Sequence, residues 1–422
     1  MGLLAGALRR WGTPLVDCDA GKALFVEPNH AARRPFDAYH LMELALERSG
    51  RRDFSDHSFI EPLQRLLRAY EEEADLSRFG RRAVHFDVSR SLANLITLDE
   101  AEDKDPSITE RPIEQPIFIT GLPRSATTFL HMLLAQDPAL AVPRSWQCMY
   151  PYPNPILGLD LRRLEVDAEF ALFRLLSPGV AALHPITADA PQECTDITAQ
   201  VFQSLRFDTT HRIPSYLNWL EGYGHHDAFR FHRRFLQHLD AQAPMNENGR
   251  RRWVLKAPDH VFAMDAIKSA YPDARFVFLH RDPLCVVASC VKLAELLHKP
   301  FTRHVDRKAL GTQVSARLVE STEEMAWAAG QDPDILHLHY RQVVARPIET
   351  IKALYSHCAM ALSAGVETRM RQWLKRPRLY RRRHPRYSLR EFGLDAHDLN
   401  RRFARYMQAF HVTPEASAAR VH

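Results

Sequence analysis

The chain has 422 residues, of which 45% are hydrophobic and 25% are charged, and it carries a formal net charge of +5 at pH 7. This is the composition of an ordinary globular protein, and the length allows either several domains or one elaborated α/β domain. The six cysteines form no Cys-x-x-Cys pair, which argues against a disulfide framework or a zinc site and favours a reducing compartment. The sequence has no uncharged apolar run of about 18 residues and no pattern of a cleaved leader, so we expect a cytoplasmic protein without a transmembrane segment.

The first part of the chain, residues 1–110, has helical periodicity. Stretches such as HLMELALERSG and PLQRLLRAYEEEADL place apolar residues three or four positions apart. Polar breaks occur at Ser49-Gly50 and around Glu102–Pro106. We therefore expect a mainly helical N-terminal region that ends near residue 110.

Beyond Arg111 the pattern changes to short apolar strands that alternate with helices. The expected strands are residues 117–120, 253–255, 276–279 and 335–339. A helical pattern follows each of them within a few residues, which predicts a parallel sheet with helices on both faces. The fold class is therefore α/β with a central parallel sheet, and a ligand is expected at the carboxyl ends of the strands.

Residues 144–252 separate the first strand-helix unit from the second and look mostly helical. We interpret them as a large helical insertion into an α/β domain, residues 111–422, at the edge where a substrate pocket would form. The tail of this domain, residues 377–422, is rich in arginine and ends in a helical pattern. Aromatic residues of the insertion that could line an apolar pocket are Trp146, Tyr150, Tyr152, Phe170, Phe173, Phe202, Phe207, Tyr216, Trp219 and Tyr223.

The stretch IFITGLPRSATTFL, residues 117–130, combines a strand, a tight loop and the start of a helix. Such a loop presents backbone N–H groups and the positive end of a helix dipole to one point, which suits a phosphate or sulfate group. Arg124, Thr127 and Thr128 can add side-chain hydrogen bonds. The Gly-x-x-x-x-Gly-Lys-Ser/Thr pattern is absent, which argues against triphosphate hydrolysis. A plain strand-to-helix turn with a threonine cap is the alternative.

The hexapeptide PRSATT, residues 123–128, resembles the 5′-phosphosulfate loop of sulfotransferases that use 3′-phosphoadenosine 5′-phosphosulfate (PAPS). In this family an arginine after a later strand and a serine eight residues further on hold the 3′-phosphate. The segment RFVFLHRDPLCVVASCVKL has Arg281 and Ser289 at that spacing. Both motifs thus occur in the family's order.

Two further segments extend the resemblance. Lys256 in WVLKAPDH ends a strand, as the catalytic lysine does in cytosolic and tyrosylprotein sulfotransferases, and LHLHYRQVVARPIETI places Tyr340 near the adenine. The tail is similar to the C-terminal end of the bacterial-type branch, so the resemblance covers about residues 111–412. It implies a P-loop-like three-layer fold, PAPS as the sulfuryl donor, 3′,5′-adenosine bisphosphate as the product, and no metal.

Ala126 stands where the family usually has glycine. We expect it to adopt a helical conformation, because alanine is disfavoured at positive φ. The residues that the resemblance assigns to the PAPS site are Gly121, Pro123, Arg124, Ser125, Ala126, Thr127, Thr128, Arg281, Ser289 and Tyr340.

Sulfuryl transfer depends on in-line positioning and on fixed cations. We expect Arg124 to stabilise the oxygen that bridges sulfur and the 5′-phosphate, and Lys256 to hold the sulfuryl oxygens. The acceptor hydroxyl needs a general base. Because Gln147 occupies the place after the loop helix where a glutamate would be expected, Glu193 is the first candidate and His260 the second; either could instead cap a helix.

The predicted function is transfer of a sulfuryl group from PAPS to a hydroxyl of an apolar small molecule or lipid. A magnesium-dependent kinase on a P-loop fold and a non-catalytic anion-binding protein are the alternatives. The histidines of GHHDAFRFHRRFLQHL lack the spacing of a metal site. The arginine cluster at residues 376–390 has no nucleic-acid-binding motif beside it. Neither a metal nor a nucleic acid is therefore predicted as a partner.

Overall fold

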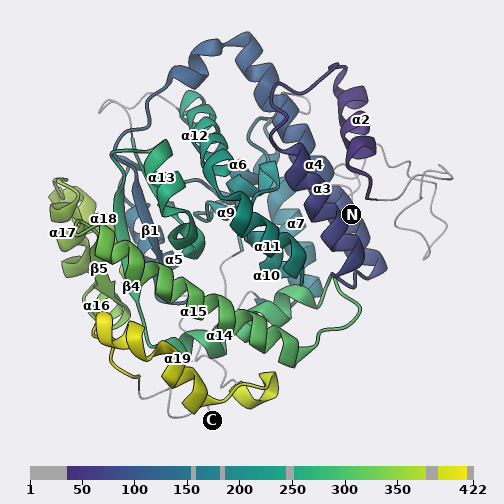
Figure 1. Cartoon of the computed structure of the whole chain (residues 1–422). Helices are drawn as coiled ribbons and strands as arrows, with labels where there is room; N and C mark the ends of the chain where they lie inside the picture. Colours follow the sequence, from purple (N-terminus) through teal and green to yellow (C-terminus); the bar gives the residue numbers. More distant parts are fainter. Residues whose placement is uncertain (1–35, 154–157, 181–185, 244–250, 377–387, 416–422) are drawn as a thin grey trace.

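The computed structural model describes residues 36–153, 158–180, 186–243, 251–376 and 388–415 (Figure 1). The expectation about a leader concerns the first 35 residues, and these lie outside the described part. Among the helices of the described part, none is long and apolar enough to cross a membrane.

A five-stranded parallel sheet lies at the centre, in the order β2-β3-β1-β4-β5. Its strands are β1 Ile117–Gly121, β2 Leu140–Ala141, β3 Arg252–Lys256, β4 Arg275–His280 and β5 Leu336–His339. The four predicted strands are confirmed, whereas β2 was missed because a strand of two residues shows no pattern. From β1 the chain runs to β2 and then β3 on one side, and it crosses to β4 and β5 on the other, which places the ligand crevice at the carboxyl end of β1.

Helices cover both faces of the sheet (Figure 1). Ile117 and Ile119 of β1 pack in a hydrophobic cluster with α5 Thr127–Leu134, α17 Pro347–His357 and α18 Ala364–Lys375. Phe118, between them, points to the opposite face and packs in a second cluster. This cluster includes residues of α12 His226–Ala241, α13 Met264–Ala270 and α14 Pro283–His298. Alternation along a strand buried on both faces thus gives the predicted three-layer α/β fold.

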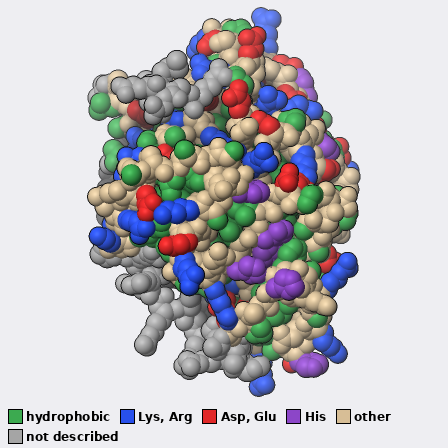
Figure 2. Space-filling model, turned by 90° about the vertical axis from the view of Figure 1, so that its left-hand side faces the viewer, with side chains coloured by type: hydrophobic (Ala, Val, Ile, Leu, Met, Phe, Trp, Pro, Cys, Tyr) green, Lys and Arg blue, Asp and Glu red, His purple; other side chains and the backbone are tan. Residues whose placement is uncertain are grey.

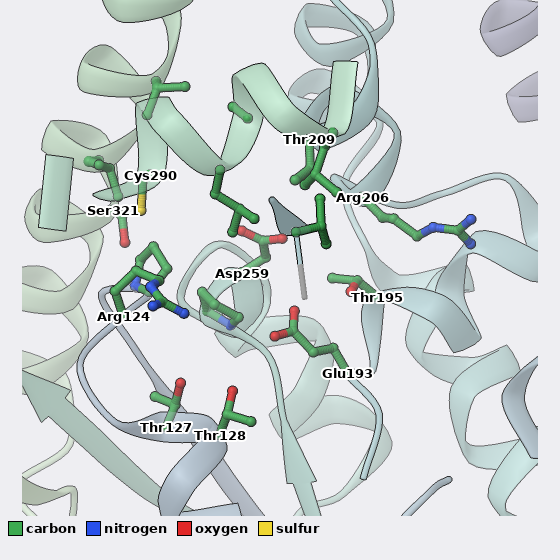
Figure 3. Close-up of a pocket in the computed structure, with 18 of the residues that line it drawn as sticks. Arg124, Thr127, Thr128, Glu193, Thr195, Arg206, Thr209, Asp259, Cys290 and Ser321 are labelled. Atoms are coloured by element: carbon green, nitrogen blue, oxygen red, sulfur yellow. The ribbon is translucent and has the colours of Figure 1, made fainter. Parts of the chain in front are cut away.

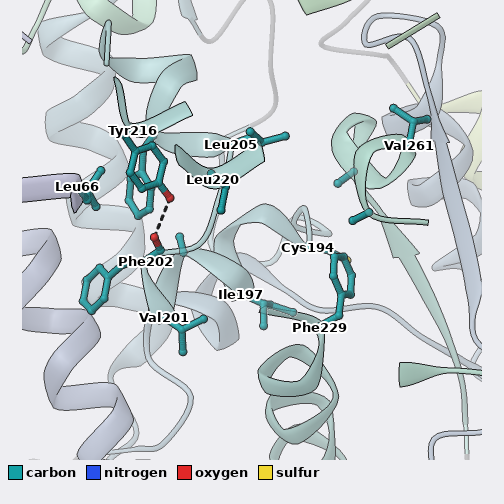
Figure 4. Packing of buried hydrophobic residues seen from close by; sticks show 14 of the residues in the cluster. Leu66, Cys194, Ile197, Val201, Phe202, Leu205, Tyr216, Leu220, Phe229 and Val261 are labelled. Carbon is teal, nitrogen blue, oxygen red and sulfur yellow. Dashed lines mark hydrogen bonds between the residues drawn. The ribbon is translucent and has the colours of Figure 1, made fainter. Parts of the chain in front are cut away.

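The N-terminal region and the insertion pack against each other in one hydrophobic core. Rings of Phe59 and Phe202 lie 6.1 Å apart, and the Tyr216 hydroxyl donates a 2.7 Å hydrogen bond to the Phe202 carbonyl (Figure 4). The N-terminal elements are α2 Ala38–Ser49, α3 Ile60–Glu72, α4 Arg78–Lys104 and η1 Pro106–Glu110. The insertion contributes α6 Ser145–Met149, α7 Arg162–Leu176, α9 Thr195–Thr198, η2 Ala199–Val201, α10 Arg206–Thr210, α11 Pro214–Tyr223 and α12.

The long helix α15 Arg307–Gln331 was not predicted. Its buried face includes Gly311, Ser315, Ser321 and Thr322, so small and polar residues obscure the apolar period. The remaining elements are η3 Pro258–Ala263, α16 Tyr340–Ala345, η4 Leu389–Phe392 and the predicted tail helix, α19 Ala396–Ala409. Most of the arginine cluster, residues 377–387, lies outside the described part.

Candidate active site

The turn after β1 is shaped by a close approach of two strands. Gly121 has φ 116°, and a Cβ on it would lie 2.3 Å from the Leu279 carbonyl oxygen of β4. Only glycine therefore fits at this position. The chain turns sharply here and reaches the first turn of α5 within a few residues, at the carboxyl edge of the sheet.

The expectation of a helical Ala126 is wrong. Ala126 caps α5 in the left-handed conformation, with φ 75° and ψ 17°, and Arg124 also has a positive φ of 63°. Left-handed residues in a short loop can turn backbone N–H groups toward one side, as in an anion-binding nest. Ala126 thus adopts a conformation that favours glycine, at a steric cost.

The other residues of the loop divide between the cavity and the core. Pro123, Arg124, Ala126, Thr127 and Thr128 line the large cavity described below. Ser125, by contrast, is completely buried, and its hydroxyl donates to the Leu122 carbonyl. Ser125 therefore holds the loop in shape, while the residues around it face the ligand space.

The loop motif and the Arg281 motif meet in space. Arg124 Nε donates a 3.1 Å hydrogen bond to Ser289 Oγ on α14, and Arg281 Nη1 donates a 2.6 Å bond to the Arg124 carbonyl. Asp282 caps α14 by accepting from the Leu284 amide at 3.0 Å. The spacing of Arg281 and Ser289 thus comes from a strand end followed directly by a capped helix.

Arg281 has two further partners, one of which the sequence did not suggest. Its guanidinium carbon lies 3.8 Å from the centre of the Tyr340 ring, and Nε and Nη2 donate to the Glu415 carboxylate at 2.7 and 3.1 Å. The Glu415 amide in turn donates to Asp282 at 2.6 Å. Both members of the ion pair are mostly buried, with 10% of the Arg281 side chain and 15% of the Glu415 side chain exposed. The Glu415 carboxylate is therefore paired with Arg281, the arginine that is predicted to hold the 3′-phosphate.

Lys256 and Glu193 form an ion pair at the carboxyl end of β3. The Cys194 amide donates to the Lys256 carbonyl at 3.1 Å, and this backbone contact holds Glu193 beside the strand. Lys256 Nζ also donates to Thr128 Oγ1 at 3.4 Å. Only 1% of the Lys256 side chain is exposed, and Glu193 and Thr128 face the cavity in front of it. The strand, the loop helix and the insertion each thus supply one of three adjoining groups.

His260, the second candidate base, does not face the cavity. Its ring packs edge-on against Phe118 at 5.0 Å and near Phe229 at 6.0 Å between ring centres, and 2% of the residue is exposed. Burial holds the pKa of His260 well below its usual range. Because η3 turns this side chain into the hydrophobic core, His260 does not line the cavity that Glu193 lines.

One cavity of about 840 Å³ connects these groups (Figure 3). It extends from the loop and Arg281 between α14, α15 and the insertion. Away from the loop its walls are largely apolar. The aliphatic and aromatic residues on these walls include Phe173, Val180, Ile186, Phe262, Leu293, Ala294, Leu297, Leu310, Val314 and Leu318.

Of the aromatic residues proposed for the pocket, Phe173 is the one that lines this cavity among the residues described. Phe202, Phe207 and Tyr216 are buried in the core instead. The apolar wall comes mainly from α14 and α15, whose aliphatic residues the sequence did not distinguish from ordinary core residues.

Four acidic side chains line the cavity. Glu193 pairs with Lys256, Asp196 lies 3.1 Å from Arg206, and the Asp208 carboxylate accepts from Gln313. The fourth, Asp259, follows Lys256 on η3. Burial raises the pKa of both Asp208 and Asp259 to about 6. Asp259 was not singled out in the sequence, where it stands next to His260.

No metal site is evident in the residues that the structure describes, since no group of three or more His, Cys, Asp or Glu side chains could hold an ion. Figure 2 shows histidines gathered on one face of the molecule. At the edge of the sheet, His337 of β5 shares a 2.8 Å hydrogen bond with His280 of β4, and the His280 ring stacks on Phe410 at 4.3 Å between ring centres. These side chains join the sheet to the tail helix.

The comparisons with known proteins agree with this geometry. A family model described as "Sulfotransferase family" matches residues 116–364. The omega-hydroxy-beta-dihydromenaquinone-9 sulfotransferase Stf3 of Mycobacterium bovis is 25% identical over 274 residues, which is 62% of this chain and 67% of that protein. The crystal structure of sulfotransferase STF1 from Mycobacterium tuberculosis is 29% identical, with a TM-score of 0.75 over 87% of this chain and 98% of that one. The structure of sulfotransferase STF9 from Mycobacterium avium is 27% identical, with a TM-score of 0.78 over 90% and 97% of the two chains. The chain therefore belongs to the sulfotransferase family.

Proposed function

We propose that this enzyme transfers the sulfuryl group of PAPS to a hydroxyl of an apolar small molecule or lipid. The observation that carries the proposal is a single cavity that has anion-binding groups at one end and aliphatic walls at the other. Arg124 stands at the first end, and Glu193 lies where the two ends meet (Figure 3). Arg281 lines the first end beside Arg124. The cavity can hold both substrates at once.

Three features support PAPS as the sulfuryl donor. The nest and the first turn of α5 offer backbone N–H groups to the 5′-phosphosulfate. Arg281 now directs two charged N–H groups at the Glu415 carboxylate, and once that carboxylate leaves, the same fork geometry suits a 3′-phosphate. Tyr340 faces the cavity beside Arg281 and provides a flat ring for the adenine.

In the proposed mechanism Glu193 takes the proton of the acceptor hydroxyl. The acceptor oxygen then forms a bond to sulfur, while the bond from sulfur to the bridging oxygen of the 5′-phosphate breaks, and that oxygen keeps the electron pair. Arg124 stabilises the charge on the bridging oxygen. When Glu193 becomes neutral its ion pair with Lys256 weakens, so Lys256 can turn its N–H groups toward the sulfuryl oxygens beside Thr128. The products are a sulfate ester and 3′,5′-adenosine bisphosphate.

The apolar walls support an acceptor with a hydrocarbon body. Each methylene group that such walls bury contributes about 0.8 kcal/mol of binding free energy. The related enzyme of Mycobacterium bovis is named for a hydroxylated menaquinone derivative, which is a lipid. We extend this acceptor class to the present enzyme. Membership in the sulfotransferase family removes the kinase and the non-catalytic protein as alternatives.

Two measurements test the proposal. Calorimetric titration should show that 3′,5′-adenosine bisphosphate binds at least about tenfold more tightly than AMP, because only the first offers a phosphate to Arg281. The same affinity is expected with magnesium or with a chelator, and tighter binding of Mg-ATP would contradict PAPS as donor. With PAPS present, kcat/KM for primary alcohols should rise about fourfold for each added methylene. A preference for a sugar over a long-chain alcohol would contradict the apolar acceptor.

A further inference from the structure

Asp259 differs from the other acidic residues of the cavity because no described residue forms a hydrogen bond or an ion pair with its carboxylate. Glu193, Asp196 and Asp208 are each satisfied by a basic or amide side chain. Within the part of the chain that the structure describes, neither a hydrogen bond nor an ion pair reaches the Asp259 carboxylate. Figure 3 shows this carboxylate pointing into the cavity, in the same space as that of Glu193.

The nearby cations are engaged elsewhere. Arg317 Nη1 lies 3.1 Å from Glu221 and 3.0 Å from Glu320, and Lys256 is paired with Glu193. Neither cation forms an ion pair with Asp259, and both act on its carboxylate only at longer range. A carboxylate that faces a largely apolar cavity without a hydrogen-bond donor is unfavourable, so such a group is normally satisfied by what binds there.

The backbone around Asp259 is held firmly. The Thr120 hydroxyl of β1 donates to the Pro258 carbonyl at 3.0 Å, and the next residue, His260, is locked into the aromatic core. Asp259 thus lies in a rigid turn shortly after β3. Its side chain could not move into the core unless the backbone of this turn also moved. Such a rigid backbone is typical of a side chain that recognises a substrate.

We propose that Asp259 accepts a hydrogen bond from a second polar group of the acceptor, an O–H or N–H that lies near the hydroxyl to be sulfated. The proposal rests on the proposed function and narrows its acceptor class to apolar molecules with two neighbouring hydrogen-bond donors, such as 1,2-diols, 1,3-diols or amino alcohols. Asp259 then determines specificity, while Glu193 takes the proton. At neutral pH the Asp259 carboxylate is ionised and has lone pairs for this bond, since its pKa of about 6 lies below 7.

The test compares 1-octanol with 1,2-octanediol and 1,3-octanediol, using the full chain, its Asp259→Asn variant and, as a matched control, Asp208→Asn. Asp208 lines the same cavity but is already satisfied by Gln313. Two quantities are measured: kcat/KM with PAPS, and binding of each alcohol by calorimetry, both with and without 3′,5′-adenosine bisphosphate. The binding arm gives a result even for a variant that does not turn over.

A hydrogen bond to a charged group should make the wild type prefer one of the diols by about 10- to 100-fold. The Asp259→Asn variant should lose most of this preference, and the Asp208→Asn variant should keep it. An equal response of the wild type to octanol and both diols would overturn the proposal, as would a preference that survives Asp259→Asn. It would also be overturned if Asp259→Asn stopped turnover of all three alcohols while the binding preference stayed, because Asp259 would then be the base. Failure of 3′,5′-adenosine bisphosphate to bind would instead contradict the sulfuryl donor, and the alcohol titrations without it would still test Asp259.

Discussion

The two ends of the cavity are built in different ways. At the anion-binding end, PRSATT, Arg281, Ser289 and Lys256 come from short segments at the carboxyl ends of β1, β3 and β4. At the apolar end, the walls come from α7, α14, α15 and the segments between them, with one or a few residues from each. Parallel strands that pair in register have their carboxyl ends side by side, whichever residues connect the strands. Local motifs at the strand ends are therefore enough to identify the anion-binding end. No local sequence motif identifies the apolar end.

The largest expected effect is at Lys256. Replacing it with alanine should lower kcat by about 100- to 1,000-fold, because a fixed donor to the sulfuryl oxygens is lost and Glu193 loses its partner. Binding of 3′,5′-adenosine bisphosphate, which has no sulfuryl group, should change little. Lys268→Ala is the control, since Lys268 pairs with Asp332 at the surface. Full activity of Lys256→Ala in steady-state assays would show that this end of the cavity works differently.

Arg281→Ala should affect binding of the donor nucleotide. We expect its affinity for 3′,5′-adenosine bisphosphate to fall by about 10- to 100-fold, because a charge-assisted pair of hydrogen bonds is lost. The affinity for AMP should stay within about twofold, since AMP has no 3′-phosphate. Calorimetry of both ligands separates this result from a general loss of the fold, which would weaken both equally.

Glu415→Gln should act in the opposite direction. The Glu415 carboxylate occupies Arg281, so its removal should tighten binding of 3′,5′-adenosine bisphosphate by about three- to tenfold. Glu391→Gln serves as a control on the exposed surface of η4. Weaker binding in Glu415→Gln would mean that the glutamate orients Arg281 for the phosphate and does not compete with it.

The smallest expected effect is at Ala126. A left-handed alanine is disfavoured by about 1–2 kcal/mol, and glycine gives back about half of that through the entropy of the unfolded chain. Ala126→Gly should therefore raise the free energy of unfolding by about 0.5–1 kcal/mol in denaturant titrations. Ala171→Gly, in helix α7, should lower it by a similar amount. If Ala126→Gly also lowered the free energy of unfolding, the left-handed conformation of Ala126 would not strain the loop.

The sequence predicted more of the fold than of the site. Apolar runs identified four strands, but the conformation of Ala126 depends on the narrow turn after Gly121, which the sequence alone does not show. His260 and Asp259 are adjacent in the chain, and only the path of η3 decides that the histidine enters the core and the aspartate the cavity. Glu415 reaches Arg281 across 134 positions, with no local signal at either residue.

The ion pair between Glu415 and Arg281 has a consequence for ionic strength. When a phosphate binds to an arginine that has no other anionic partner, a new ion pair forms, and salt weakens the attraction between its two charges. Here one anion is exchanged for another, and salt weakens the pair that is broken as well as the pair that is formed. The part of the nucleotide affinity that depends on the 3′-phosphate should then vary little between dilute and concentrated salt. Release of the nucleotide is also assisted, since the Glu415 carboxylate can replace the 3′-phosphate on Arg281.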